Sequence, residues 1–205
     1  MRTHGLSILL VSAALLAARL DSGVLDREWL GVSETAGEWR TPAGIDYLWV
    51  KPGFSLASRT LNLEPWTAPV FRNGERDRED SRLAIQLTDS MPGRLQSALS
   101  AAGVVGVSRT EGDIRVTGRF VDCNAGSIVL RLMAGSGVIV GNATWEIKLM
   151  DAATGETLAA VHHRAVSGAD SRNLGEKISL WLTRVFAPAL HDSFDVYAKA
   201  PVARE

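Results

Sequence analysis

The sequence has a single cysteine, Cys123, so no disulfide can form within the chain. In an oxidising compartment the fold must therefore depend on its apolar core. No cysteine stands directly after the apolar N-terminal segment either, and we therefore do not expect a lipoprotein. Cys123 ends a strand-like run, and we predict a small core residue there rather than a nucleophile, because the sequence points to no nearby base.

An excess of charge of either sign is also absent, since 22 basic and 23 acidic residues leave a formal net charge of −1. A nucleic-acid partner calls for a basic face that displaces counterions from phosphates, so we expect none. Lysine is scarce: the chain has 4 lysines among its 22 basic residues, and this arginine bias indicates a GC-rich bacterium. We therefore give no weight to the glycosylation sequon Asn142-Ala143-Thr144.

No apolar run reaches the roughly 20 residues that a membrane span needs. The N-terminal run at residues 6–18 follows a short basic segment and precedes a polar restart at Arg19. This pattern predicts a secretory signal or export segment at residues 1–23, and a periplasmic or secreted protein. A cut after Ala18 places Leu16 where a small residue is preferred. An uncleaved segment that tethers the chain to the inner membrane therefore stays open, as does a buried N-terminal helix.

The rest of the chain divides into three parts by composition. Residues 24–53 carry three tryptophans among glycine, proline, serine and threonine, namely Trp29, Trp39 and Trp49. We expect an irregular arm whose indoles pack on the body of the protein, with each indole N–H needing a partner. Residues 54–190 are predicted to form one domain, because 46% hydrophobic residues in a chain of 205 suit a single core. Residues 191–205 are expected to be a loosely ordered tail.

The domain begins with a strand pattern and continues with a charged loop. Leu61 and Leu63 alternate with polar neighbours and the pattern stops at Pro65, which predicts a first strand. Residues 72–82 then mix charges of both signs densely, which is typical of a solvated loop.

A helix is predicted next, because apolar residues recur at helical spacing from Leu83 until Gly103 stops the pattern. Pro92 interrupts this run. Either one helix kinks at the proline, or Asp89 or Ser90 caps a second helix that starts beside it.

Residues 114–123 and 142–150 alternate between apolar and polar positions, which predicts two half-buried strands. The positions expected to face the core are Ile114, Val116, Gly118, Phe120, Ala143, Trp145, Ile147 and Leu149. The positions expected to face water are Arg115, Thr117, Arg119, Thr144, Glu146 and Lys148. Turn residues at 151–156 and a further strand at 157–166 complete a hairpin, and opposite charges on its wetted face suit antiparallel pairing.

A second helix is predicted near the C-terminus. Asn173 and Glu176 form a capping-box pattern before an apolar stripe that Pro188 is expected to end. The elements together predict an α+β fold, in which two helices pack on one face of a mostly antiparallel sheet, in the order β-α-β-(β)-β-β-α.

The segment Gly135-Ser136-Gly137 raises the question of a phosphate-binding loop. Such a loop needs a helix after its glycines, and the residues that follow, VIVGNATWEI, are poor helix formers. The glycine spacing also misses the dinucleotide fingerprint, no lysine follows as in a P-loop, and no G-x-S-x-G elbow is present. We therefore expect these glycines to serve bends, bulges or close strand packing, and we predict no cofactor-binding residue.

Three histidines are the candidates for catalysis or metal binding. His162 and His163 are neighbours on a predicted strand, so their side chains point to opposite faces and cannot chelate one ion together. A metal site would need distant help, for example from His191. We predict no metal site and no catalytic residue.

The motifs at residues 115–161 resemble a bacterial envelope family, the domain-of-unknown-function family 4410. The matching residues are Gly126, Ser127, Arg131, Gly135, Gly137, Asp151, Thr154, Gly155, Glu156 and Leu158. Residues 47–65 are similar to the related family 3313, in which a V-x-P-G phrase precedes the first strand. The resemblance covers roughly residues 47–187. It implies a periplasmic or outer-membrane-associated protein, often a lipoprotein, without established catalytic residues. The missing lipobox cysteine departs from that pattern and favours a soluble periplasmic form.

We therefore expect a non-catalytic exported envelope protein that binds a partner protein or another envelope component. One alternative is an exported hydrolase or metal-dependent enzyme that uses His162, His163 or His191. Another is peripheral membrane binding through residues 125–141, an apolar stretch whose one charge is Arg131. The oligomeric state is left open.

Overall fold

A computed structural model of the chain describes residues 25–33, 36–71, 78–125, 141–166 and 174–203. Its centre is a six-stranded sheet in the order β1-β6-β5-β4-β2-β3. The strands are β1 (Tyr47–Val50), β2 (Leu61–Leu63), β3 (Val107–Ser108), β4 (Ile114–Asn124), β5 (Asn142–Asp151) and β6 (Thr157–Val166). The pairs β1–β6, β6–β5 and β5–β4 are antiparallel, whereas β2 runs parallel to both β4 and β3. The sheet is therefore mixed but mostly antiparallel.

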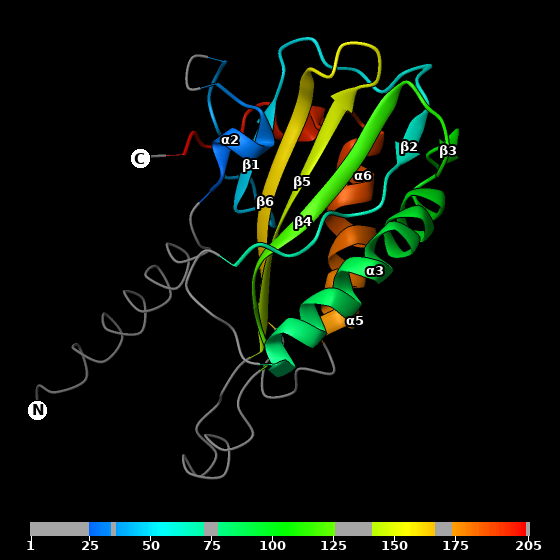
Figure 1. Cartoon of the computed structure of the whole chain (residues 1–205). Helices are drawn as coiled ribbons and strands as arrows, with labels where there is room; N and C mark the ends of the chain where they lie inside the picture. The colour runs from blue at the N-terminus through cyan, green and yellow to red at the C-terminus, as the bar shows by residue number, and fades with distance from the viewer. Residues whose placement is uncertain (1–24, 34–35, 72–77, 126–140, 167–173, 204–205) are drawn as a thin grey trace, which may run out of the picture.

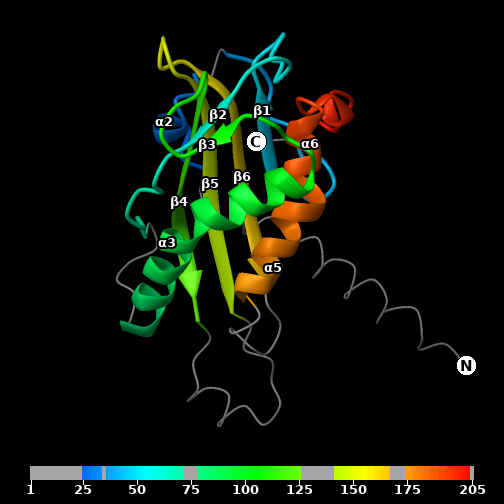
Figure 2. The same ribbon diagram turned by 90° about the vertical axis from the view of Figure 1, so that its right-hand side faces the viewer.

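The helices divide between the two faces of this sheet (Figures 1 and 2). Helix α3 (Arg78–Ala101) and the continuous rod of α5 (Leu174–Trp181), a π-helical turn (Leu182–Phe186) and α6 (Ala187–His191) cover one face. The short helix α2 (Arg27–Leu30) lies on the other face. The predicted α+β class, with two helical segments on one face of the sheet, is confirmed.

The hairpin β5–β6 and its neighbour β4 form as the alternation predicts. Arg119 lies opposite Glu146 and Thr117 opposite Lys148, and the positions predicted to face the core are buried under α3 and α5. The prediction that the opposite face is wetted is wrong. Arg119 and Glu146 are both buried, because α2 and the described residues around it cover that face. The alternation identifies two faces, but it does not say what lies on each.

The region expected to be an irregular arm supplies this cover and also the edge strand β1. Asp26 caps α2 by accepting a hydrogen bond from the amide of Trp29. Leu30, Val32, Trp39 and Trp49 pack with Ala160 of β6 in a second apolar cluster. The indole N–H of Trp49 donates to the carbonyl of Ala36, which supplies one of the expected partners. The sheet therefore begins before residue 54.

The described part of the expected tail also contacts the arm. Arg40 forms an isolated bridge with Val202, and the amide of Ala203 donates to the carbonyl of Trp39 at 2.7 Å. Phe194 is buried against Phe54 and Phe186. These contacts fasten the C-terminal end of the described chain to the arm and to the core.

Pro92 lies inside α3, which is one helix from Arg78 to Ala101. The alternative of a second helix capped by Asp89 or Ser90 is therefore wrong. The proline removes one backbone hydrogen bond, but Leu87, Met91 and Leu95 on either side of it are buried in the core. The burial of this apolar stripe holds the helix together across the proline.

Pro188 does not end the C-terminal helix as predicted. A π-helical turn precedes it, so Pro188 lies in the first turn of α6, where a missing N–H needs no intrahelical partner. The helical rod consequently continues to His191. Across the described residues, no helix combines the length and apolar character required to cross a membrane.

Candidate functional site

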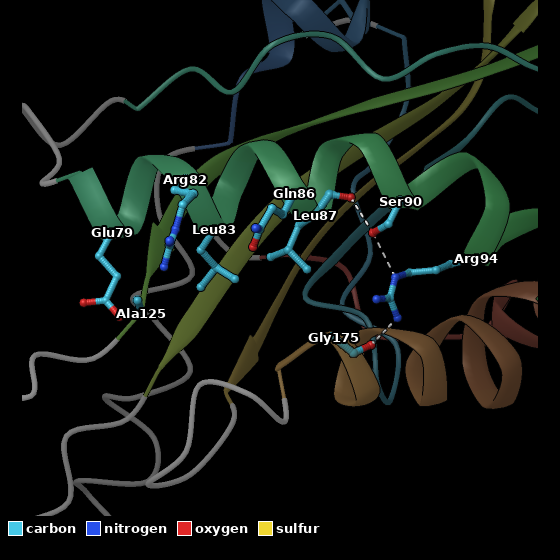
Figure 3. A pocket seen from close by; sticks show the side chains of 9 residues that line it. All are labelled: Glu79, Arg82, Leu83, Gln86, Leu87, Ser90, Arg94, Ala125 and Gly175. Atoms are coloured by element: carbon cyan, nitrogen blue, oxygen red, sulfur yellow. Dashed lines mark hydrogen bonds between the residues drawn. The ribbon is translucent and has the colours of Figure 1, made fainter.

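A groove lies between α3 and α5, at the end of the sheet where β4 stops (Figure 3). It has a volume of about 420 Å³, and it is lined by Glu79, Arg82, Leu83, Gln86, Leu87, Ser90, Arg94, Ala125 and Gly175. The amide of Ala125 donates to Asp80 Oδ1 at 2.6 Å, which ties the end of β4 to the first turn of α3. Helix α3 thus supplies one wall, and α5 closes the far end.

Arg94 is held in a fixed position at the α5 end of the groove. Its Nε donates to Ser90 Oγ at 3.0 Å, and its Nη1 donates to the carbonyl of Gly175 at 2.8 Å and to Ser179 Oγ at 2.6 Å. Gly175 makes this approach feasible, because a Cβ there would lie 3.0 Å from Arg94 Nη2. The side chain therefore reaches from one helix to the other with its orientation determined by three neutral acceptors.

The rest of the lining combines apolar and polar side chains. Leu87 is buried and Leu83 half-buried, whereas Gln86, Arg82 and Glu79 are exposed. In Figure 3 the side chains of Leu83, Gln86 and Leu87 extend from the same side of α3, toward the side on which Arg94 reaches Gly175. Such a lining can receive a ligand that has both an aliphatic part and a group that accepts hydrogen bonds from a cation.

A second polar cluster lies on the opposite face of the sheet, beneath α2. Glu146 Oε2 accepts from Arg119 Nε at 3.0 Å and Nη2 at 2.8 Å, and its Oε1 accepts from the amide of Asp26 at 2.8 Å. Arg119 also pairs with the Asp26 carboxylate, and His162 Nδ1 lies 3.3 Å from Glu146 Oε1. All four residues are buried, so this cluster holds α2 on the sheet rather than facing a ligand.

Trp29 covers the same cluster from the side of α2. The guanidinium carbon of Arg119 and the ammonium of Lys148 each lie 4.3 Å from the centroid of its ring. Lys148 Nζ also donates to the carbonyl of Trp29 at 2.7 Å. Burial, together with the nearby positive charge of Arg119, lowers the pKa of Lys148.

The structure does not bring the three candidate histidines together. His162 lies in the cluster under α2, while His163 is on the opposite face and stacks on Trp181 at 4.6 Å between ring centroids. His191 is on the surface at the end of α6, with its Nδ1 2.9 Å from Asp192 Oδ1. The predicted opposite orientation of His162 and His163 is confirmed.

His163 also has a carboxylate neighbour, since its Nδ1 lies 3.2 Å from Asp46 Oδ2. Burial raises the pKa of Asp46, but the contact with His163 and the amide of Arg164, which donates at 2.8 Å, outweigh it and leave this pKa below its ordinary value. This pair fastens β6 to the loop before β1.

Cys123 is a buried residue of the main core, as predicted. Among the described residues, no three His, Cys, Asp or Glu side chains are grouped so that they could hold a metal ion. Gly135-Ser136-Gly137 and nearly all of the apolar stretch 125–141 lie outside the described residues.

The motif at residues 151–156 has a structural role in the β5–β6 turn. Asp151 Oδ1 accepts from the amides of Ala153 and Thr154, at 3.1 and 3.0 Å, and from Thr154 Oγ1 at 3.1 Å. Gly155 adopts a positive φ of 73°, and Asp151 Oδ2 pairs with Arg59 at 2.6 Å. The Thr154 amide and Arg59 keep the pKa of Asp151 low. These motif residues thus fix the shape of a turn.

The groove is the feature that the sequence analysis missed. Arg94 follows Leu87 by seven residues, which places a guanidinium on the apolar side of α3, and this was the available signal. Its partners, Gly175 and Ser179, lie more than 80 residues away in the chain. Nothing in the local pattern predicts that pairing.

Comparison with known proteins gives a family but no activity. The model of the family described as "Domain of unknown function (DUF4410)" matches residues 60–170. No curated protein matches the chain. Among solved structures, the PelC dodecamer from Paraburkholderia phytofirmans is similar over 69% of this chain and 95% of its own, with 11% identity and a TM-score of 0.46. Protein XCC0632 from Xanthomonas campestris, of the family DUF330, is similar over 72% and 89%, with 12% identity and a TM-score of 0.44.

Proposed function

Since the chain belongs to the DUF4410 family, whose description names no activity, we propose that it is a non-catalytic exported protein of the bacterial envelope that binds a partner. The partner is another protein or an envelope component, and the binding site is the groove between α3 and α5. The proposed location is the periplasm or the exterior, on account of the predicted export segment at residues 1–23.

The observation that carries this proposal is the contrast between the groove and the rest of the sheet. The central strands are covered on one face by α3 and α5 and on the other by α2 and the segment around it. Within the described part of the chain the groove remains open, and it combines the buried side chain of Leu87 and the half-buried side chain of Leu83 with a fixed guanidinium. Binding sites are usually open pockets that are lined by apolar side chains and a few oriented polar groups.

Site-specific photocrosslinking in intact bacteria tests the proposal. A photoreactive residue replaces Gln86, which is exposed and lines the groove, and in a matched chain it replaces Glu111, which is exposed near the opposite end of the sheet. We expect a discrete adduct from position 86 and none from position 111. The same adducts from both positions, or no adduct from position 86, would contradict the proposal.

A further inference from the structure

We propose that the groove binds an extended, acidic segment of a partner protein, with a carboxylate on Arg94 Nη2 and an aliphatic side chain against Leu83 and Leu87. This inference rests on the proposed function and adds the chemical class of the ligand. Three features support it: the unpaired charge of Arg94, the length of the groove and the character of its lining.

The charge of Arg94 calls for an anion. The side chain is half-buried, yet the acceptors of its three hydrogen bonds are two hydroxyls and a carbonyl, all of them neutral. Within the described residues Arg94 makes no ion pair, and no atom accepts a hydrogen bond from Nη2. A partly desolvated guanidinium is normally paired, and carboxylates accept its N–H groups in short, charge-assisted bonds.

The other end of the groove does not cancel this preference. Glu79 and Arg82 both line it and carry opposite charges, so that end is close to neutral. The net positive charge of the lining therefore lies at Arg94.

The dimensions fit an extended chain. The lining on α3 runs from Glu79 to Arg94, which corresponds to about 22 Å at the rise of an α-helix. A groove of this length with a volume of about 420 Å³ is narrow. An extended peptide, at about 3.3 Å per residue, would span it with about six or seven residues.

The lining favours a peptide over a lipid chain. Aliphatic positions, Leu83 and Leu87, alternate along the groove with the polar positions Gln86 and Ser90. A peptide backbone offers the exposed Gln86 amide both donors and acceptors, which an acyl chain does not. A carboxylate on a peptide with aliphatic side chains matches the whole lining.

Titration of the isotope-labelled full chain with synthetic peptides tests the inference, with the Nε–H of Arg94 and the methyl groups of Leu83 and Leu87 as NMR reporters. One pool contains acetylated, amidated hexapeptides of leucine and alanine with one aspartate, placed at each position in turn. The control pool has asparagine in place of aspartate. We expect the aspartate pool to shift all three reporters and to bind about tenfold more tightly than the asparagine pool.

A pair of variants tests whether the peptide binds in the groove. Gln86→Glu adds a negative charge to the groove and is expected to weaken binding of the aspartate pool about three- to tenfold. Gln96→Glu makes the same change on α3 outside the lining and is expected to leave binding unchanged. Both variants keep Arg94 and its hydrogen bonds, so folding is not at stake.

Several outcomes would overturn the inference: equal binding of the two pools, an equal effect of the two variants, or no shift with either pool. Shifts caused by short-chain phosphatidylglycerol, when the peptides cause none, would identify a lipid instead. If an adduct forms at position 86 but the pools bind equally, only the acidic class is wrong and the proposed function stands. If neither adduct nor peptide binding is found, both proposals fail.

Discussion

The two faces of the central strands are buried by opposite means. On one face Phe120, Trp145 and Ile147 pack under α3 and α5, mainly through apolar and aromatic contacts. On the other face Arg119 and Glu146, which are just as inaccessible, are held by Asp26 and His162 beneath α2. Apolar packing depends on volume and shape, whereas a buried charge cluster depends on every partner being present.

This contrast shows which face of the sheet restricts the segment that can cover it. Many segments with an apolar stripe could cover the first face. The second face requires a segment that brings a carboxylate to Arg119 and a backbone amide donor to Glu146, as Asp26 does. The charged cluster thus selects which part of the chain returns to the sheet.

The largest expected effect is on the apolar face. Trp145→Ala removes a fully buried ring whose centroid lies 5.1 Å from that of Trp181 and 6.1 Å from that of Phe120. We expect the free energy of unfolding to fall by about 3–5 kcal/mol, measured by chemical denaturation. Val105→Ala, at an exposed position, serves as the control and should change it by less than about 0.5 kcal/mol. A loss below about 1 kcal/mol for Trp145→Ala would mean that this face is not closely packed.

The charged face is examined by Glu146→Gln, which keeps the shape and removes the charge. This carboxylate contacts Arg119, His162 and the amide of Asp26. We therefore expect the free energy of unfolding to fall by about 1.5–3 kcal/mol. Combining the change with Arg119→Met in a double-mutant cycle should give a coupling of about 0.5–3 kcal/mol. Additive losses would show that the two side chains do not act as a unit.

Gly118 of β4 lies where the ring of Trp66 packs closely against the sheet, and a substitution there tests that packing. A Cβ at this position would lie 2.6 Å from the ring of Trp66 and 2.7 Å from the backbone oxygen of Glu146. Gly118→Ala should therefore cost about 1–3 kcal/mol by overpacking, measured by thermal and chemical denaturation. The control is Gly93→Ala, at a position of α3 that has open space around it. This change should instead raise the free energy of unfolding by up to about 1 kcal/mol. A neutral result at Gly118 would contradict the close approach of Trp66.

The smallest expected effect depends on pH and concerns the link between β6 and the loop before β1. The folded-state pKa of Asp46 is lowered, so the carboxylate stabilises the fold above its ordinary pKa of 3.8, and this stability is lost as the pH falls through the folded value. Asp46→Asn should therefore lower the free energy of unfolding by about 1 kcal/mol or less at pH 7, and by less at pH 3 than at pH 7. Urea denaturation at both pH values measures the difference, and an equal cost at both would exclude the ionised carboxylate as the cause.

Much of the fold follows from local patterns. The alternation in 114–123 and 142–150 predicts β4 and β5, and the turn chemistry of Asp151 and Gly155 predicts where the hairpin reverses. The helical spacing after Leu83 predicts α3. These signals are reliable because side chains two residues apart in a strand, or three to four apart in a helix, share a face whatever lies beyond it.

The wrong predictions share one cause, which is tertiary packing. The wetted face, the second helix at Pro92 and the stop at Pro188 were each judged from neighbouring residues alone. The structure overrides them through burial of the stripe around Pro92, a π-helical turn ahead of Pro188 and the return of α2. Each of these depends on tertiary packing, which local propensity does not contain.

The sequence by itself determined which residues form strands and helices and which of their sides is apolar, because hydrophobic periodicity is a local property. Only the tertiary structure decided that Arg119 and Glu146 are buried and that Arg94 is fixed in a groove. The reason is distance along the chain: Asp26 reaches Glu146 across 120 residues, and Arg94 reaches Gly175 across 81.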